Sequence, residues 1–222
     1  MAYLEYNGQM VIFNDQYVIS SPLPGIDGVI DFDGINDWVD FTTAYVPSFD
    51  INSGISFKFY LDNDSGYTGE RLYNLNIDSL SYISGILLDS SLYLMGFKNA
   101  GFVSQRRMID ISGLNAQVLD CSINIENSAV TEIIINGVSQ TIYTTTGGDT
   151  SHAGNNSIGS NGANDYLSNA TIWDFKIYDN TNTLIHAYAG QPSGNTDGAW
   201  ADSVGSYDGT VEGSPTTRNL PV

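Results

Sequence analysis

The sequence predicts an all-β protein: a two-sheet antiparallel β-sandwich preceded by an amino-terminal β-hairpin arm. Short segments that alternate apolar and polar residues recur along the chain, and they are rich in Ile, Val, Tyr and Phe. Gly, Asn, Asp and Ser separate these segments, and almost nothing shows the periodicity of a helix. A dozen or so short strands with frequent turns are typical of a sandwich or barrel. A chain of 222 residues is long enough to bury the core of one such domain.

The arm is expected to span residues 1–24, with a hairpin of residues 11–13 and 16–20 around Asn14-Asp15. Residues 25–222 then form the sandwich, including a C-terminal segment, 190–222, that wraps the sandwich or reaches a partner. The strands expected in the sandwich cover residues 28–32, 38–43, 55–62, 71–77, 86–89, 92–98, 118–126, 132–143, 170–179 and 183–190. Hairpin turns are expected at Ser90-Ser91, Asn136-Gly137 and Asn180-Thr181-Asn182.

The charge balance excludes several classes of protein. The chain has 25 Asp and Glu against 7 Lys and Arg, a net charge of −18, yet only 14% of its residues are charged. A hydrophobic content of 41% excludes a disordered acidic tail, and the acidity argues against nucleic-acid binding. The amino terminus lacks the pattern of a signal peptide, and no stretch is apolar enough to span a membrane. We therefore expect a chain that is made in a cytoplasm and does not insert into membranes, with its lone cysteine, Cys121, buried.

Three segments together resemble a known family. They are DFDGINDWVDF (31–41), SIGSNGANDYLSNATIWDFKIYD (157–179) and AWADSVGSYDGTVEGSPT (199–216). They are similar to motifs of laminin-G-like, concanavalin-A-like lectin/glucanase domains, and this resemblance implies a two-sheet jelly roll. In the commonest arrangement of that family the third motif precedes the other two, whereas here it follows them. This order resembles that of head-surface and tail-surface proteins of tailed bacteriophages.

The first motif suggests a calcium site. Asp31, Asp33, Asn36 and Asp37 supply hard oxygen ligands around Gly34, as Ca²⁺ prefers. The resemblance implies one structural calcium at this loop, completed near Asp174. The alternative is that Asp33 and Asn36 only shape the turn through Asx hydrogen bonds.

Sugar binding is the commonest ligand chemistry that the resemblance implies. Saccharides stack on aromatic rings, and Tyr67, Tyr166 and Trp200 are the candidates because they lie in Asn/Asp/Gly-rich loops. Trp38 and Trp173 lie in strands beside β-branched residues, so core packing is the better interpretation for them.

The sequence predicts no catalytic residues and no enzymatic activity. Related glucanases carry an E-x-D-x-E pattern on one strand, which none of the five glutamates here begins; Glu126 and Glu132 instead flank a turn. There is no G-x-S-x-G motif, and the two histidines are His152 in a loop and His186 in a strand. His186 is better interpreted as a strand residue with a satisfied side chain than as a general base.

These observations predict a non-enzymatic structural protein of a tailed-phage virion, either a capsid decoration, a head fibre or a tail-surface component. Its expected partners are capsid or tail subunits, further copies of itself and a cell-surface glycan, and its expected location is the virion, after synthesis in the host cytoplasm. The Arg106-Arg107 pair is expected in a loop, either solvated or facing an acidic partner. The alternatives are a free carbohydrate-binding module and, behind it, a glycan hydrolase.

Overall fold

The computed structural model describes fifteen stretches of the chain, in which every regular element is a β-strand. The described residues are 3–6, 9–12, 26–41, 53–61, 68–76, 82–88, 91–97, 105–111, 113–114, 116–126, 129–146, 156–160, 167, 169–190 and 199–220. A helix with the length and apolar character needed to cross a bilayer is not found among them.

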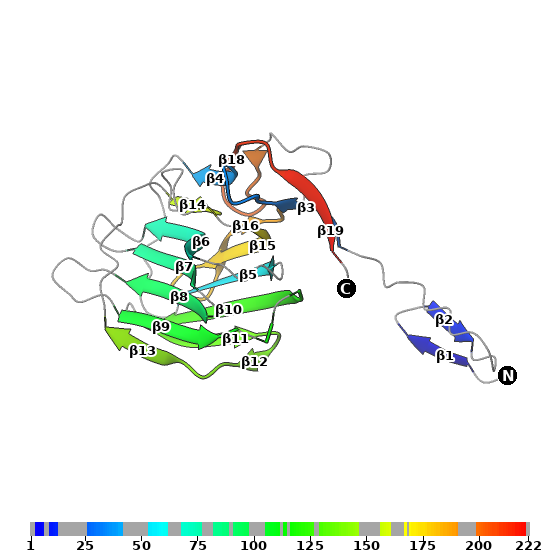
Figure 1. The fold of residues 1–222 in the computed structure, drawn as a ribbon, viewed down its shortest axis with the longest axis horizontal. Helices are drawn as coiled ribbons and strands as arrows, with labels where there is room; N and C mark the ends of the chain where they lie inside the picture. Colours follow the sequence, from blue (N-terminus) through cyan, green and yellow to red (C-terminus); the bar gives the residue numbers. More distant parts are fainter. Residues whose placement is uncertain are drawn as a thin grey trace.

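Nineteen strands form two large antiparallel sheets and a separate two-stranded hairpin (Figure 1). The strands are β1 (Tyr3–Tyr6), β2 (Gln9–Ile12), β3 (Ile26–Asp31), β4 (Trp38–Phe41), β5 (Ser53–Leu61), β6 (Thr68–Asn76), β7 (Tyr82–Leu88), β8 (Ser91–Phe97), β9 (Gln105–Asp110), β10 (Val118–Glu126), β11 (Ala129–Ile135), β12 (Val138–Ser139), β13 (Tyr143–Thr146), β14 (Asn156–Ile158), β15 (Ala170–Tyr178), β16 (Leu184–Tyr188), β17 (Ala199–Trp200), β18 (Gly209–Glu212) and β19 (Thr216–Leu220). The predicted all-β sandwich is thus confirmed.

The first large sheet has eight strands in the order β12-β11-β10-β5-β15-β3-β19, with β16 also paired to β15. One side of β15 pairs with β5, and the other side pairs first with β3 and then with β16. A bulge lies between Trp173 and Lys176, where Asp174 has a φ of 50°. The extra residue lets Phe175 return to the core side of the sheet while Asp174 stays outside.

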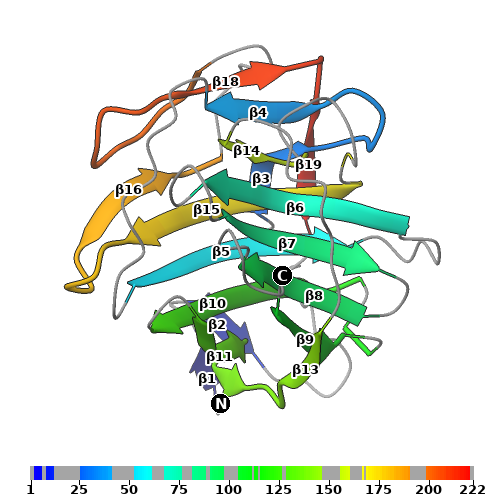
Figure 2. The same cartoon turned by 90° about the vertical axis from the view of Figure 1, so that its left-hand side faces the viewer.

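The second sheet has nine strands in the order β13-β9-β8-β7-β6-β14-β4-β18-β17 and faces the viewer in Figure 2. The chain crosses between the sheets repeatedly: β3 and β5 belong to the first sheet, while β4 and β6 belong to the second. The C-terminal segment, expected to wrap the sandwich or reach a partner, contributes β17 and β18 to the second sheet and β19 to the first.

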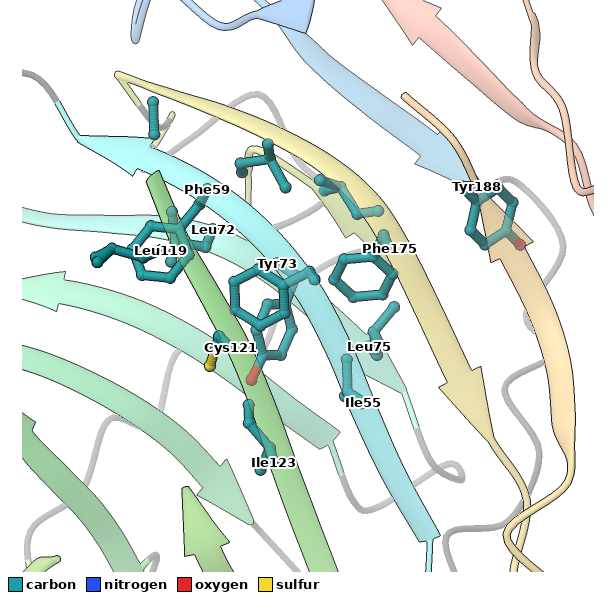
Figure 3. Close-up of a cluster of buried hydrophobic side chains, with 14 of the residues drawn as sticks. Ile55, Phe59, Leu72, Tyr73, Leu75, Leu119, Cys121, Ile123, Phe175 and Tyr188 are labelled. Carbon is teal, nitrogen blue, oxygen red and sulfur yellow. The ribbon is translucent and has the colours of Figure 1, made fainter. Parts of the chain in front are cut away.

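The core lies between the two sheets and follows from the period-two pattern. In β10, Leu119, Cys121, Ile123 and Ile125 are buried, whereas the residues between them face outward. Aromatic rings fill the centre, where the ring centroids of Phe57 and Phe175 are 5.5 Å apart and those of Phe57 and Tyr73 are 5.4 Å apart. Figure 3 shows Tyr73 and Cys121 among these side chains. Cys121 is free and fully buried as predicted, and burial raises its pKa.

The described part of the amino-terminal hairpin has a different strand pair from the one predicted. β2 contains Val11 and Ile12 of the first predicted strand, but it pairs with β1, so that Tyr3 lies opposite Ile12 and Tyr6 opposite Gln9. The residues between the two strands are Asn7-Gly8, a dipeptide that favours two-residue hairpin loops. The predicted partner strand, residues 16–20, lies outside the described residues.

Most of the predicted sandwich strands are present within a few residues of their predicted bounds. Asn136 and Gly137 have φ values of 51° and 77°, as a tight hairpin between β11 and β12 requires. The prediction for Arg106-Arg107 is wrong, because both residues lie in β9, opposite Thr145 and Thr144 of β13. The Arg107 guanidinium donates a hydrogen bond to the Thr144 hydroxyl.

Candidate functional site

The turn between β3 and β4 holds three of the predicted calcium ligands: Asp33, Asn36 and Asp37. The Asp33 carboxylate accepts hydrogen bonds from the backbone N–H of Ile35 at 2.7 Å and of Asn36 at 3.2 Å. This is the Asx arrangement in which a carboxylate shapes its own turn. Both Asp33 and Asn36 remain exposed.

Asp37 is buried and joins this turn to the segment between β18 and β19. One carboxylate oxygen accepts the Asp33 N–H at 3.3 Å, and the other accepts the Ser214 N–H at 3.0 Å. Burial raises the pKa of Asp37, and the nearby charge of Asp33 raises it further, while the Ser214 N–H lowers it. The carboxylate therefore connects two segments that are 177 residues apart in the sequence.

Asp31 and Asp174 lie on the outer face of the eight-stranded sheet, each bound to other side chains. Asp31 accepts a hydrogen bond from the Thr171 hydroxyl at 2.7 Å, and the Arg218 guanidinium is 3.7 Å away. Asp174 forms ion pairs with Lys176 at 2.6 Å and Lys58 at 3.3 Å. Both oxygens of the Asp174 carboxylate, which the resemblance places near a calcium ion, are thus paired with lysines.

The structure thus brings Asp33 and Asp37 together on one turn and places Asp31 and Asp174 in other interactions. No group of three or more His, Cys, Asp or Glu suited to a metal ion occurs among the described residues. The Asx hydrogen bonds that the sequence offered as the alternative are present. Calcium binding stays a prediction.

The predicted sugar-binding residues do not form one site in the described part of the chain. Trp200, a candidate for stacking on a sugar, is a buried residue with 2% of its surface exposed, and its ring stacks on Tyr188 with a centroid separation of 5.7 Å. The sequence near Trp200 suggested a loop, but this residue belongs to β17, and its side chain is part of the hydrophobic core. Tyr67 and Tyr166 lie outside the described residues.

Sequence reasoning missed the partner of His186, which is Asp202. The Nδ1 atom of His186 lies 2.6 Å from one carboxylate oxygen of Asp202, and both side chains are almost completely buried. His186 comes from β16, and Asp202 opens the turn between β17 and β18. The signal was available in the third motif, whose "DSVGSYD" stretch carries an aspartate at each end and a glycine between them, as a turn held by Asx hydrogen bonds would.

Asp202 holds the whole turn through its carboxylate. Besides His186, it accepts backbone N–H groups from β16 and from the turn itself: Ala187, Val204, Gly205 and Tyr207. Burial by itself raises the pKa of Asp202, but the hydrogen bonds from His186 and from the backbone outweigh it and hold this pKa at about 2. Asp202 is therefore charged under all ordinary conditions.

The residues around the His186–Asp202 pair are engaged in packing and in backbone hydrogen bonds. The His186 ring packs against the rings of Tyr188 and Tyr207, with centroids 6.3 Å and 5.4 Å away. The nearby Ser203 hydroxyl, the residue type that a nucleophile would need, donates to the Ala187 carbonyl at 3.0 Å. The pair orients a turn, and the interpretation of His186 as a satisfied strand residue is confirmed.

A row of polar residues crosses the outer face of the nine-stranded sheet. Asn74 of β6, Ser157 of β14, Asp40 of β4 and Thr210 of β18 lie opposite one another in successive strand pairs. Asn74 and Ser157 are buried, and the Ser157 hydroxyl donates to the Ser160 carbonyl at 2.7 Å. The end of this row on β6 and β14 is therefore buried, whereas the end on β18 is exposed.

The two glutamates considered for hydrolysis lie at the outer face of the eight-stranded sheet. Glu132 accepts a hydrogen bond from the Asn124 amide at 2.9 Å, and Glu126 is exposed at the end of β10. Neither glutamate therefore lies in the apolar environment that raises the pKa of a general acid. Comparison with known proteins adds no assignment, since no protein-family model matches the chain and a search of curated proteins found no match.

Proposed function

We propose that the chain is a non-enzymatic structural protein of a tailed-phage virion, a capsid decoration, head fibre or tail-surface component. In this proposal a laminin-G-like, concanavalin-A-like sandwich is displayed on the particle, and residues 1–24 attach it to a capsid or tail subunit. The observation that carries the proposal is that β1 and β2 pair with each other and with neither large sheet. A two-stranded hairpin is marginally stable in water without further contacts, so an arm of this kind favours a partner.

The contacts of the aspartates support a display role over catalysis. The aspartates that could serve chemistry instead hold turns or pair with basic side chains: Asp33, Asp37, Asp174 and Asp202. The order of the three family-like motifs, with residues 199–216 last, adds the resemblance to phage surface proteins.

The test is mass spectrometry of purified particles from a phage that encodes this chain. We expect the full chain in the particles and its loss when residues 1–24 are deleted, while a variant changed only at the exposed Ile35 (Ile35→Ser) is still incorporated. Particles that contain no copies of the wild-type chain would contradict the proposal.

Glycan recognition, as a free carbohydrate-binding module, is the alternative. Its remaining candidates are Tyr67 and Tyr166, both in segments of the sequence that are rich in Asn, Asp and Gly. A glycan array with the wild-type chain and with Tyr67→Ala and Tyr166→Ala tests it. Binding that either substitution abolishes supports the alternative, and the absence of binding by the wild-type chain contradicts it.

A further inference from the structure

β13 is an open edge strand of the nine-stranded sheet. In the described part of the chain, β12 and β19 end the eight-stranded sheet, and β13 and β17 end the nine-stranded sheet. An open edge can pair with another chain, and proteins prevent this with very short strands, prolines, lysines or bulges. β12 and β17 have two residues each, and β19 has an irregular register and lies between Pro215 and Pro221.

β13 has none of these devices. Its sequence, Tyr-Thr-Thr-Thr, contains no proline or lysine, and its register with β9 is unbroken. Tyr143 is 57% exposed, and Thr144 is exposed too, so this edge is not covered there. Three β-branched threonines suit a strand that pairs on both sides.

The chain around β13 is poor in negative charge, with Asp110 at the end of β9 and Asp149 in the sequence after β13 as the nearest acids. Residues 133–148 contain no charged residue, and residues 91–109, which include β8 and most of β9, contain Lys98, Arg106 and Arg107 but no acid. In a chain with a net charge of −18, this is a surface where two copies can approach while bringing few carboxylates together. Repulsion between the more distant acids is screened beyond about 8 Å at physiological ionic strength.

An exposed apolar residue also lies on β12, the edge strand of the eight-stranded sheet that precedes β13 in the chain. Val138 of β12 is 62% exposed and precedes β13 by five residues. Together with Tyr143 it accounts for two of the four large hydrophobic side chains that are exposed in the described part of the chain. The other two, Ile35 and Val204, lie in turns.

We propose that β13 is a self-association strand, which pairs antiparallel with β13 of a second copy and joins their nine-stranded sheets across a twofold axis. Such an isologous contact matches each edge with itself, so neither copy needs a complementary charged surface. Because four residues a side bury little area, the dimer is weak and forms at high local concentration, as in a multicopy assembly. The inference does not depend on the proposed virion function.

Sedimentation equilibrium of the full chain tests this proposal. We expect a reversible monomer–dimer equilibrium that Tyr143→Asp weakens at least about tenfold, because it places a carboxylate from each copy beside the shared edge. Val138→Asp should weaken it less, because it adds a carboxylate on β12, at the same end of the sandwich but in the other sheet (Figure 1). Val204→Asp and Ile35→Asp are matched controls: they add the same charge at exposed apolar positions elsewhere and leave the equilibrium unchanged. Thermal melts confirm that all four variants fold.

Two further measurements identify the contact. Amides of residues 143–146 should gain protection from hydrogen exchange at high protein concentration in the wild-type chain but not in Tyr143→Asp. Added salt should strengthen the dimer, because it screens repulsion between two acidic copies. A chain that stays monomeric at every concentration, controls that weaken the dimer equally, or a dimer that salt dissociates would overturn the proposal.

Discussion

At the residue scale, aspartates in this protein act mainly as acceptors for turns. Asp202 binds five donors around one turn, and Asp33 and Asp179 each cap a turn of their own. The Thr181 hydroxyl and nearby backbone N–H groups lower the pKa of Asp179. Part of the large acidic excess thus consists of aspartates that stabilise the short turns between strands.

The pH dependence of stability tests the role of the Asp202 charge. Its pKa is about 2 in the folded chain against 3.8 for an ordinary aspartate, so its stabilisation is complete above about pH 4 and is lost as the pH falls towards 2. We expect Asp202→Asn to lower the free energy of unfolding by about 2 kcal/mol at pH 7, measured by urea denaturation. The difference from wild type should shrink between pH 4 and pH 2, and a difference that is constant with pH would contradict the role of the charge.

Tyr73 offers a second test at this scale. Its side chain is fully buried, its hydroxyl has no hydrogen-bond partner in the described part of the chain, and burial, with Cys121 nearby, raises its pKa well above the usual value. We expect Tyr73→Phe to raise the free energy of unfolding by about 1 kcal/mol, because it removes an unsatisfied polar group. Tyr188→Phe is the matched control: this hydroxyl donates to the Tyr207 carbonyl at 2.9 Å, so its removal should cost about 1 kcal/mol.

At the element scale, the turn between β18 and β19 depends on a glycine. Gly213 has a φ of 82°, and a Cβ there would lie 2.3 Å from the Asp37 carboxylate oxygen that receives the Ser214 N–H. We expect Gly213→Ala to lower the free energy of unfolding by at least about 2 kcal/mol, from backbone strain and from the clash. Gly137→Ala is the control, with a similar φ of 77° and open space, and should cost only about 1 kcal/mol. Equal losses in chemical denaturation would show that the Asp37 contact contributes nothing.

Strands with a clear apolar alternation could be predicted from the sequence, and others could not. Residues 118–126 were predicted as a strand and form β10 with the same bounds. β9 was missed because Gln105–Asp110 has no such alternation; its place in the sheet comes from its neighbours β8 and β13. The pairing of β2 with Tyr3–Tyr6 was not predicted, because Asn7-Gly8 and Asn14-Asp15 are both good turn sequences; the predicted turn at Asn14-Asp15 lies outside the described residues.

At the scale of the whole molecule, the calcium prediction has a direct test. If Ca²⁺ binds at the turn between β3 and β4, EDTA should lower the melting temperature of the wild-type chain but not that of Asp33→Asn/Asp37→Asn. An unchanged wild-type melting temperature after chelation would contradict the prediction. The double variant is also expected to melt below wild type in EDTA, since Asp37 is bonded to Ser214.

The sequence by itself determined the fold class, the positions of most strands and the burial of Cys121, because these depend on local periodicity and turn chemistry. Only the tertiary structure decided which carboxylates meet which partners. Asp174 meets Lys58 because a bulge turns it outward. Asp202 meets His186 because an isolated β-bridge between Tyr188 and Asp202 brings the end of β16 beside the turn after β17. Trp200 was misjudged for the same reason: its burial depends on Tyr188, twelve residues earlier on another strand. Long-range pairing is set by the packing of two sheets, which no local pattern encodes.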